Sequence, residues 1–230
     1  MRAVSLLAVA TGLALVPCAA SIGPVFGSTT FVSRVDNPWF PLAPGTVYTY
    51  VGVKDGKPSR DVVTVTQTKR RIAGVDATEV KDELYVEGRI EERTTDWYAQ
   101  DRAGNVWYLG ESTAELDRSG RVTNREGTWL TGRDGAQPGI YMPAHPVVGQ
   151  SGRQEFLKGH AEDHFRVVKL TASVKSPYVT TSHALLTEEW TPLEPSVLDH
   201  KLYVRGIGTV REETVKGGVE RNVLVSLRRP

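Results

Sequence analysis

The sequence is poor in cysteine, with one, Cys18, among 230 residues. No disulfide can therefore form within the chain, and a stable fold requires a substantial hydrophobic core. Long apolar runs are equally scarce. The longest begins after Arg2 and extends from Ala3 to Val16, which is too short to cross a bilayer. We therefore predict no transmembrane segment.

Residues 1–20 have the composition of a secretory signal peptide. The apolar run and Pro17 are followed by the small residues Cys18, Ala19 and Ala20. Cleavage after Ala20 would leave a mature chain without cysteine. A lipoprotein would instead keep Cys18 as its lipidated first residue, but Pro17 is a poor substitute for the small residue usual there. The segment predicts a secreted protein, or one of the periplasm or cell envelope.

An excess of charge of either sign is also missing. The chain has 28 Lys and Arg against 27 Asp and Glu, a formal net charge of +1. Such a balance gives no electrostatic reason to bind nucleic acid. The sequence has no Gly-x-Ser-x-Gly nucleophile elbow, phosphate-binding Gly loop or dinucleotide fingerprint, so we predict no cofactor.

What the sequence does contain is short segments rich in Val, Thr, Tyr and Trp between frequent turn signals. This pattern is typical of antiparallel strands, and no interval of ten residues has helical apolar spacing. We predict an all-β fold, an antiparallel meander curled into a barrel-like or half-barrel sheet. The predicted strands cover residues 46–54, 60–70, 77–87, 89–101, 105–111, 121–130, 153–159, 162–175, 180–191, 198–205, 207–215 and 219–228.

Two segments interrupt the meander. Residues 21–45 form a predicted Pro-rich N-terminal cap, in which Trp39 and Phe40 cover one end of the core, and residues 46–230 form a predicted single β domain. Residues 131–152 hold five Gly and three Pro around the apolar group Ile140, Tyr141 and Met142. Loops of this length are uncommon in compact domains unless they cover a site, so we predict a lid.

The stretch "TTDWYAQDRAGNVWYLGE", residues 94–111, predicts a hairpin with aromatic pairs on both strands. Adjacent side chains of a strand point to opposite faces, so Trp97 and Tyr98 are divided between the core and the other face, as are Trp107 and Tyr108. Cross-strand aromatic pairs stabilise such a hairpin. We interpret Tyr98 and Trp107 as candidate walls of a pocket.

Residues 89–101 carry charge on both faces. One face has Ile90, Glu92, Thr94, Asp96 and Tyr98, and the other has Glu91, Arg93, Thr95, Trp97 and Ala99. A strand with one solvated and one buried face should alternate cleanly. Either this is an edge strand or its inner face lines a polar cavity, in which case Asp96 is the residue of interest.

Two more segments place polar groups beside apolar ones. In "HALLTEEWTPLEP" either Glu188, with Trp190, or Glu189 must share a face with apolar neighbours. In "VLDHKLYV" the alternation predicts that His200 points inward and Lys201 outward. An inward His beside a carboxylate can act as a general base or be an ordinary core residue.

The segment "GHAEDHF", residues 159–165, contains two His and two carboxylates. In a strand, His160, Glu162 and His164 would share one face at intervals of about 6.5 to 7 Å. This spacing is too extended for three ligands of one ion without help from another strand, so we predict no metal site.

The phrases "NPWFPLAPGTVYTY", "DWYAQDRAGNVWYLGE", "GAQPGIYMPAHP", "EEWTPLEP" and "HKLYVRGIGTV" resemble an uncharacterised family of secreted or lipid-anchored bacterial β-rich proteins, to which no activity is assigned. The closing "YVRGIGTVREE" is also similar to the last strands of curved-sheet envelope proteins that hold lipid-like ligands. The polar residues within the family phrases are Asp96, Glu111, Glu189, Glu194 and His200.

Three functions are compatible with these observations. The first is an extracytoplasmic binding protein that holds a small amphipathic or lipid-like molecule in a concave β pocket. Its candidate ligand-binding residues are Tyr98, Trp107, Tyr141, Met142 and Trp190. The second is a structural or partner-binding envelope protein. The third is a carbohydrate-active enzyme with Asp96, Glu189 and His200 as acid and base groups.

Overall fold

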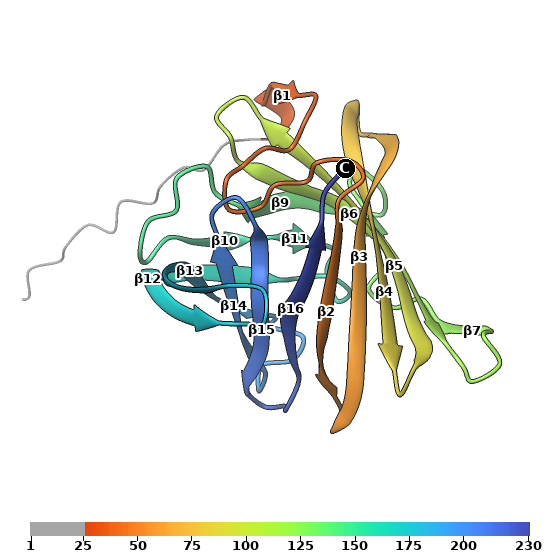
Figure 1. Ribbon diagram of the computed structural model, residues 1–230. Coiled ribbons are helices and arrows are strands. Elements are labelled where there is room, and N and C mark those ends of the chain that lie inside the picture. The colour runs from red at the N-terminus through yellow and green to blue at the C-terminus, as the bar shows by residue number, and fades with distance from the viewer. Residues whose placement is uncertain (1–25) are drawn as a thin grey trace, which may run out of the picture.

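The computed structural model describes residues 26–230, which fold almost entirely into antiparallel strands (Figure 1). The predicted signal peptide over residues 1–20, with Cys18, lies outside the described residues. The elements are the 3-10 helix η1 (Phe26–Ser28) and the strands β1 (Phe31–Val32), β2 (Val47–Lys54), β3 (Lys57–Ile72), β4 (Val75–Val86), β5 (Arg89–Asp101), β6 (Val106–Leu116), β7 (Val122–Asn124), β8 (Trp129–Leu130), β9 (Gln137–Met142), β10 (Ser151–Arg153), β11 (Glu155–Phe156), β12 (His164–Lys175), β13 (Thr180–Trp190), β14 (Leu198–Val204), β15 (Gly208–Lys216) and β16 (Arg221–Arg228).

The sheet curls into a nearly closed barrel. Thirteen strands follow one another in the hydrogen-bonded order β10-β12-β13-β14-β15-β16-β2-β3-β4-β5-β6-β9-β11. The two ends of this path, β10 and β11, are separated in the chain by Gln154 alone, so the path returns to its start (Figure 1). The last strand, β16, pairs with β2, which brings Leu224 opposite Tyr50. The predicted all-β, curled antiparallel meander is confirmed.

The Gly/Pro-rich segment over residues 131–152 is divided by a strand. Its middle forms β9, which pairs with β6, with Ile140 opposite Trp107, and with β11 on its other side. A Cβ atom on Gly139 would lie 2.2 Å from the carbonyl oxygen of Arg153, so glycine is what allows the chains to approach here. The apolar group that we expected in a lid therefore belongs to the barrel wall, and the turn-like composition hides a six-residue strand.

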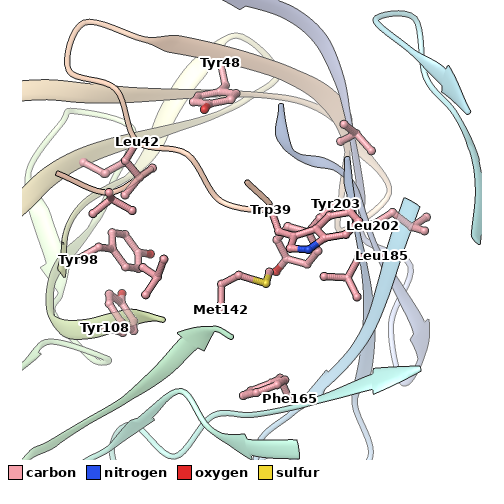
Figure 2. Packing of buried hydrophobic residues seen from close by; sticks show 14 of the residues in the cluster. Trp39, Leu42, Tyr48, Tyr98, Tyr108, Met142, Phe165, Leu185, Leu202 and Tyr203 are labelled. Carbon is pink, nitrogen blue, oxygen red and sulfur yellow. The ribbon is translucent and has the colours of Figure 1, made fainter. Parts of the chain in front are cut away.

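The aromatic residues of the β5–β6 hairpin separate to two faces, as the alternation predicts. Tyr98 and Tyr108 stack inside the barrel with ring centroids 4.7 Å apart. Trp97 and Trp107 belong to a second cluster on the outer face. Figure 2 shows Tyr98 and Tyr108 on one side of the interior, and Leu185 and Tyr203 on the opposite side.

The segment before β2 crosses the end of the barrel at which β2 begins (Figure 1). Val35 and Leu42 form an isolated bridge, which turns the segment back on itself. Between them, Asn37 donates hydrogen bonds to the carbonyl oxygens of Gly104, at 2.9 Å, and Pro143, at 3.1 Å. Trp39 is buried within the barrel cluster (Figure 2). These contacts fix the cap segment, residues 35–42, to the barrel.

Candidate ligand-binding cavity

The barrel encloses a cavity of about 450 Å³, a volume within the range of small-molecule sites. Its wall is formed by inward-facing side chains of the strands around most of the barrel. The cap segment contributes Phe40, Pro41 and Leu42, and the junction of β10 and β11 contributes Gln154 and Glu155. The interior is therefore hollow rather than filled by the alternating apolar residues of an ordinary small barrel.

The cavity wall is acidic. Nine carboxylates line it, one third of the acidic residues of the chain, together with a single basic residue, Lys201. The near-zero net charge of the sequence thus conceals a strong segregation of charge. The nine are Asp61 on β3, Asp82 on β4, Glu92 and Asp96 on β5, Glu111 on β6, Glu155 on β11, Asp163 before β12, Glu189 on β13 and Glu212 on β15.

The strand register gives the cavity two chemically different ends. On β5, the inward residues run from Tyr98, next to the cap segment, through Asp96 and Thr94 to Glu92. The same order recurs across the sheet, since Tyr48 on β2 lies opposite Val63, and Tyr50 lies opposite Asp61. An aromatic end therefore lies under the cap segment, and an acidic end lies farther along the barrel.

Lys201 compensates two of the carboxylates. Its Nζ lies 2.9 Å from Glu189 Oε2 and 3.4 Å from Glu212 Oε1. Burial opposes the charge of the ammonium group, but these two carboxylates raise the pKa of Lys201 well above its usual value. The hydroxyls of Thr187 and Tyr203 each donate a 3.0 Å hydrogen bond to Glu189. Both oxygens of Glu189 therefore have partners within the wall.

The other seven carboxylates form no ion pair with any basic residue of the described chain. The hydroxyl of Tyr108 lies between two of them, hydrogen-bonded to Asp96 and, at 2.8 Å, to Glu111. One hydroxyl proton cannot serve two carboxylates, so one of the two acids must itself carry a proton. Burial raises the pKa of Asp96 to about 7, and burial with the charge of Asp96 raises the pKa of Glu111 to about 8.

A second acid pair crosses from β3 to β4. Burial raises the pKa of both Asp61 and Asp82, and a hydrogen bond between them raises that of Asp82 further while lowering that of Asp61. The two carboxyl groups therefore share a proton as a pair. On the opposite wall, burial and the charges of Asp163 and Glu111 raise the pKa of Glu155 to about 9. The cavity can bind and release several protons near neutral pH.

Four of the residues expected at the site line this cavity, namely Asp96, Glu189, Tyr98 and Tyr141. The cavity interpretation of residues 89–101 is the correct one, because β5 lies between β4 and β6 and is not an edge strand.

His200 does not line the cavity, and the prediction that its imidazole points inward is wrong. Its Nε2 lies 3.7 Å from Glu188 Oε1, and Glu188 also pairs with the exposed Arg166. On β14 the inward positions belong to Lys201 and Tyr203, because the buried Glu189 and the half-buried Glu212 compensate the ammonium charge. The prediction took the face of β14 that carries Leu198 and Leu202 as the inward one because these residues are apolar.

The remaining three candidates also lie outside the cavity. Trp107 is covered on the outer face by Phe26 and Phe31, with ring centroids 5.5 and 6.2 Å away, and its Nε1 donates to Asp101. Met142 is packed in the barrel cluster. Trp190 stacks on His164 at 5.6 Å. None of the three is in the cavity wall.

Sequence reasoning did not single out Asp61, Asp82, Glu155, Asp163, Glu212 or Lys201. A signal existed on β3, where Asp61 is in phase with the inward apolar residues Val63 and Val65. Within residues 26–230 there is no cluster of three or more His, Cys, Asp or Glu arranged to hold a metal ion. Over the same range, no helix is long and apolar enough to span a membrane.

Two solved structures are similar to this chain. One is a protein from Bacteroides fragilis that is inferred to be exported and has a YMCC-like fold, with 17% identity, a TM-score of 0.46 and coverage of 83% of this chain and 99% of that chain. The other, from Parabacteroides distasonis, is inferred to be a lipoprotein, with 14% identity, a TM-score of 0.43 and coverage of 87% and 99%. No protein-family model and no curated protein matches the chain, which is consistent with the uncharacterised family that its phrases resemble.

Proposed function

We propose that the protein is an extracytoplasmic binding protein that holds a small amphipathic molecule inside the barrel. The signal-peptide composition of residues 1–20 supports the location. The observation that carries the binding function is the cavity of about 450 Å³ with an aromatic and an acidic end. The apolar part of the ligand packs under the cap segment, and its polar part lies among the carboxylates.

The aromatic end is preformed for an apolar group. Phe40 of the cap segment contacts Tyr98 and Tyr141, with ring centroids 5.2 and 4.6 Å away. The hydroxyl of Tyr48 donates a 2.9 Å hydrogen bond to the carbonyl oxygen of Pro41, which holds the cap segment against the wall. Rigid aromatic walls of this kind reduce the conformational entropy that binding must offset.

The enzyme alternative loses one of its three groups, because His200 is outside the cavity that contains Asp96 and Glu189. A partner-binding role has no comparable feature in its favour. Binding is therefore the function that the geometry supports best.

The test uses three eight-carbon probes that differ only in their head group: octylammonium, octanol and octanoate. Calorimetric titration of the purified protein should detect binding of at least one probe. Val63→Phe places a larger side chain in the cavity wall, and Val62→Phe places the same side chain on the opposite face of β3. We expect Val63→Phe to weaken binding about tenfold or more, because it fills the space that the ligand occupies, and Val62→Phe to bind as the wild type does.

Binding of none of the three probes, or equal loss in both variants, would contradict the proposal. Thermal unfolding of each variant in the absence of probe confirms that the barrel is intact. Native mass spectrometry of the purified protein provides a second measurement, because a tightly held small molecule would appear as a constant added mass.

A further inference from the structure

We propose that the ligand of the cavity is a cation, an amphipathic amine whose ammonium group lies among the carboxylates of the acidic end and whose hydrocarbon part lies under the cap segment. This inference rests on the proposed function, since it names the ligand class of the same cavity. It goes further because an amphipathic ligand could equally be neutral or anionic.

The first observation is the charge that the protein leaves uncompensated. Buried carboxylates require a proton or a counter-cation, because desolvation of an isolated charge is costly. Lys201 meets this requirement for Glu189 and Glu212 alone. The other seven carboxylates have no basic partner in the described chain, and they come from both walls of the barrel. Two of them are buried, four are half-buried and Asp163 is exposed, so the requirement for a proton or a counter-cation applies to six of the seven. A positively charged ligand would supply the missing counter-charge.

The second observation is that buried polar atoms facing the cavity make no hydrogen bond within the protein. They are Asp61 Oδ1, an acceptor at the acidic end, and, on the opposite wall, the acceptor Glu155 Oε2 and the donor Gln154 Nε2. Gln154 is only 3% exposed. Buried polar groups are rarely left without a partner, so the cavity is built for a polar molecule. The unpaired carboxylate oxygens suit a molecule that donates hydrogen bonds, as an ammonium group does.

The third observation is the chemistry of the aromatic residues. Five tyrosines and Phe40 line the cavity, and the faces of such rings attract cations. The protein already uses this interaction for its own cation, because Lys201 Nζ lies 5.9 Å from the centroid of the Tyr141 ring. Carboxylates combined with aromatic faces favour an ammonium group over a carboxylate or phosphate of the same size.

The pKa shifts predict how the affinity for an ammonium ion changes with pH. The free protein holds protons on Asp96, Glu111 and Glu155, whose pKa values are raised to about 7, 8 and 9. An ammonium ion replaces these protons, so its affinity should rise between pH 6 and pH 9, where a primary amine stays charged. The other charged or titratable groups facing this space are Asp61, Asp82, Glu92, Asp163, Glu189, Lys201, Glu212, Tyr48, Tyr50, Tyr98, Tyr108 and Tyr141.

The experiment compares the same three probes, octylammonium, octanol and octanoate, by calorimetric titration at pH 6 and pH 9. We expect octylammonium to bind with an affinity at least about tenfold higher than that of octanol at pH 9, and with a smaller preference at pH 6. Octanoate should bind most weakly. A phosphate-free buffer series with different ionisation enthalpies should also show release of protons when octylammonium binds at pH 8.

A matched pair of variants on β5 locates the effect. Glu92 lines the acidic end, whereas Glu91, the preceding residue of the same strand, does not line the cavity. Glu92→Gln keeps the shape of the side chain and an oxygen that can accept the 3.2 Å hydrogen bond from the Thr94 hydroxyl. We expect it to weaken octylammonium binding about three- to tenfold without changing octanol binding, and Glu91→Gln to change neither.

Equal affinity of octanol and octylammonium at both pH values would overturn the cationic ligand and leave the proposed function standing. If octanoate bound most tightly of the three probes, the cationic ligand would likewise be overturned and the proposed function would stand. Binding of none of the probes would overturn both proposals. Loss of octylammonium binding in Glu91→Gln as well as Glu92→Gln would place the site outside the barrel.

Discussion

Replacement of Asp96 by Asn should stabilise the protein relative to the wild type, and the difference should grow as the pH rises. Asp96 is 9% exposed and accepts a hydrogen bond from the Tyr108 hydroxyl, which an Asn side-chain oxygen can also accept. The substitution therefore removes a buried charge while it keeps the shape and the hydrogen bond. Glu111, which shares the same hydroxyl, would then ionise more easily because the neighbouring charge is gone.

The sign and the size of this change in the free energy of unfolding follow from the pKa of Asp96 in the folded state. Burial raises this pKa from 3.8 to about 7, so between these pH values the folded protein binds more protons than the unfolded chain. The wild type therefore loses stability as the pH rises through this window, and the whole penalty is present above pH 7. Between pH 5 and pH 7, two pH units within this window, the wild type loses about 2 to 3 kcal/mol of its free energy of unfolding.

Urea unfolding followed by tryptophan fluorescence at pH 5, 7 and 9 measures this difference. The free energy of unfolding of Asp96→Asn relative to the wild type should increase by about 2 to 3 kcal/mol between pH 5 and pH 9. Glu91→Gln, on the same strand but outside the cavity wall, is the control and should show no such trend. Parallel pH profiles for Asp96→Asn and the wild type would refute the assignment of Asp96 as a buried acid that ionises near neutral pH.

Three further variants test the contacts around the cavity. Lys201→Met leaves Glu189 and Glu212 without a cation and should cost about 3 to 5 kcal/mol at pH 8, and less at pH 5, in the same unfolding assay. Arg166→Met, which breaks an exposed ion pair with Glu188, should cost less than about 1 kcal/mol, and an equal cost in both variants would argue against a special role of the buried network. Asn37→Ala removes two hydrogen bonds to the barrel and should cost about 2 to 3 kcal/mol, and an unchanged midpoint of unfolding would show that the cap segment is held by other contacts.

The strands could be predicted from the sequence because the turns are marked by Gly and Asp, and the segments between them are rich in β-branched and aromatic residues. The strand β9 could not, because Pro138 and Gly139 resemble a loop, and only their pairing with β11 and β6 makes the segment a strand. Local composition predicts where chains turn. It does not show where a distant strand supplies a partner.

The cavity was predictable in part for a similar reason. On β5, the charge on both faces was compatible with an edge strand or with a polar interior, and only the pairing of β5 with β4 and β6 decides for the interior. On β14, the alternation rule assigned apolar residues to the inside, but both faces are partly covered and the inward Lys201 is paired with carboxylates of neighbouring strands. A buried charge can be recognised only when its counter-charge is known, and that information comes from the register between strands.

An interior of this kind is costly, and its cost connects binding to stability. A cation that binds the folded protein alone stabilises it by RT ln(1 + [L]/Kd), and it also relieves the repulsion between Asp96, Glu111 and their neighbours. The stabilisation by a cation should therefore be larger at high pH, where these carboxylates are charged. A neutral ligand would leave the repulsion in place, so its stabilising effect would not grow with pH. The pH dependence of ligand-induced stabilisation thus distinguishes a cavity built to receive a cation from one that merely has room for a small molecule.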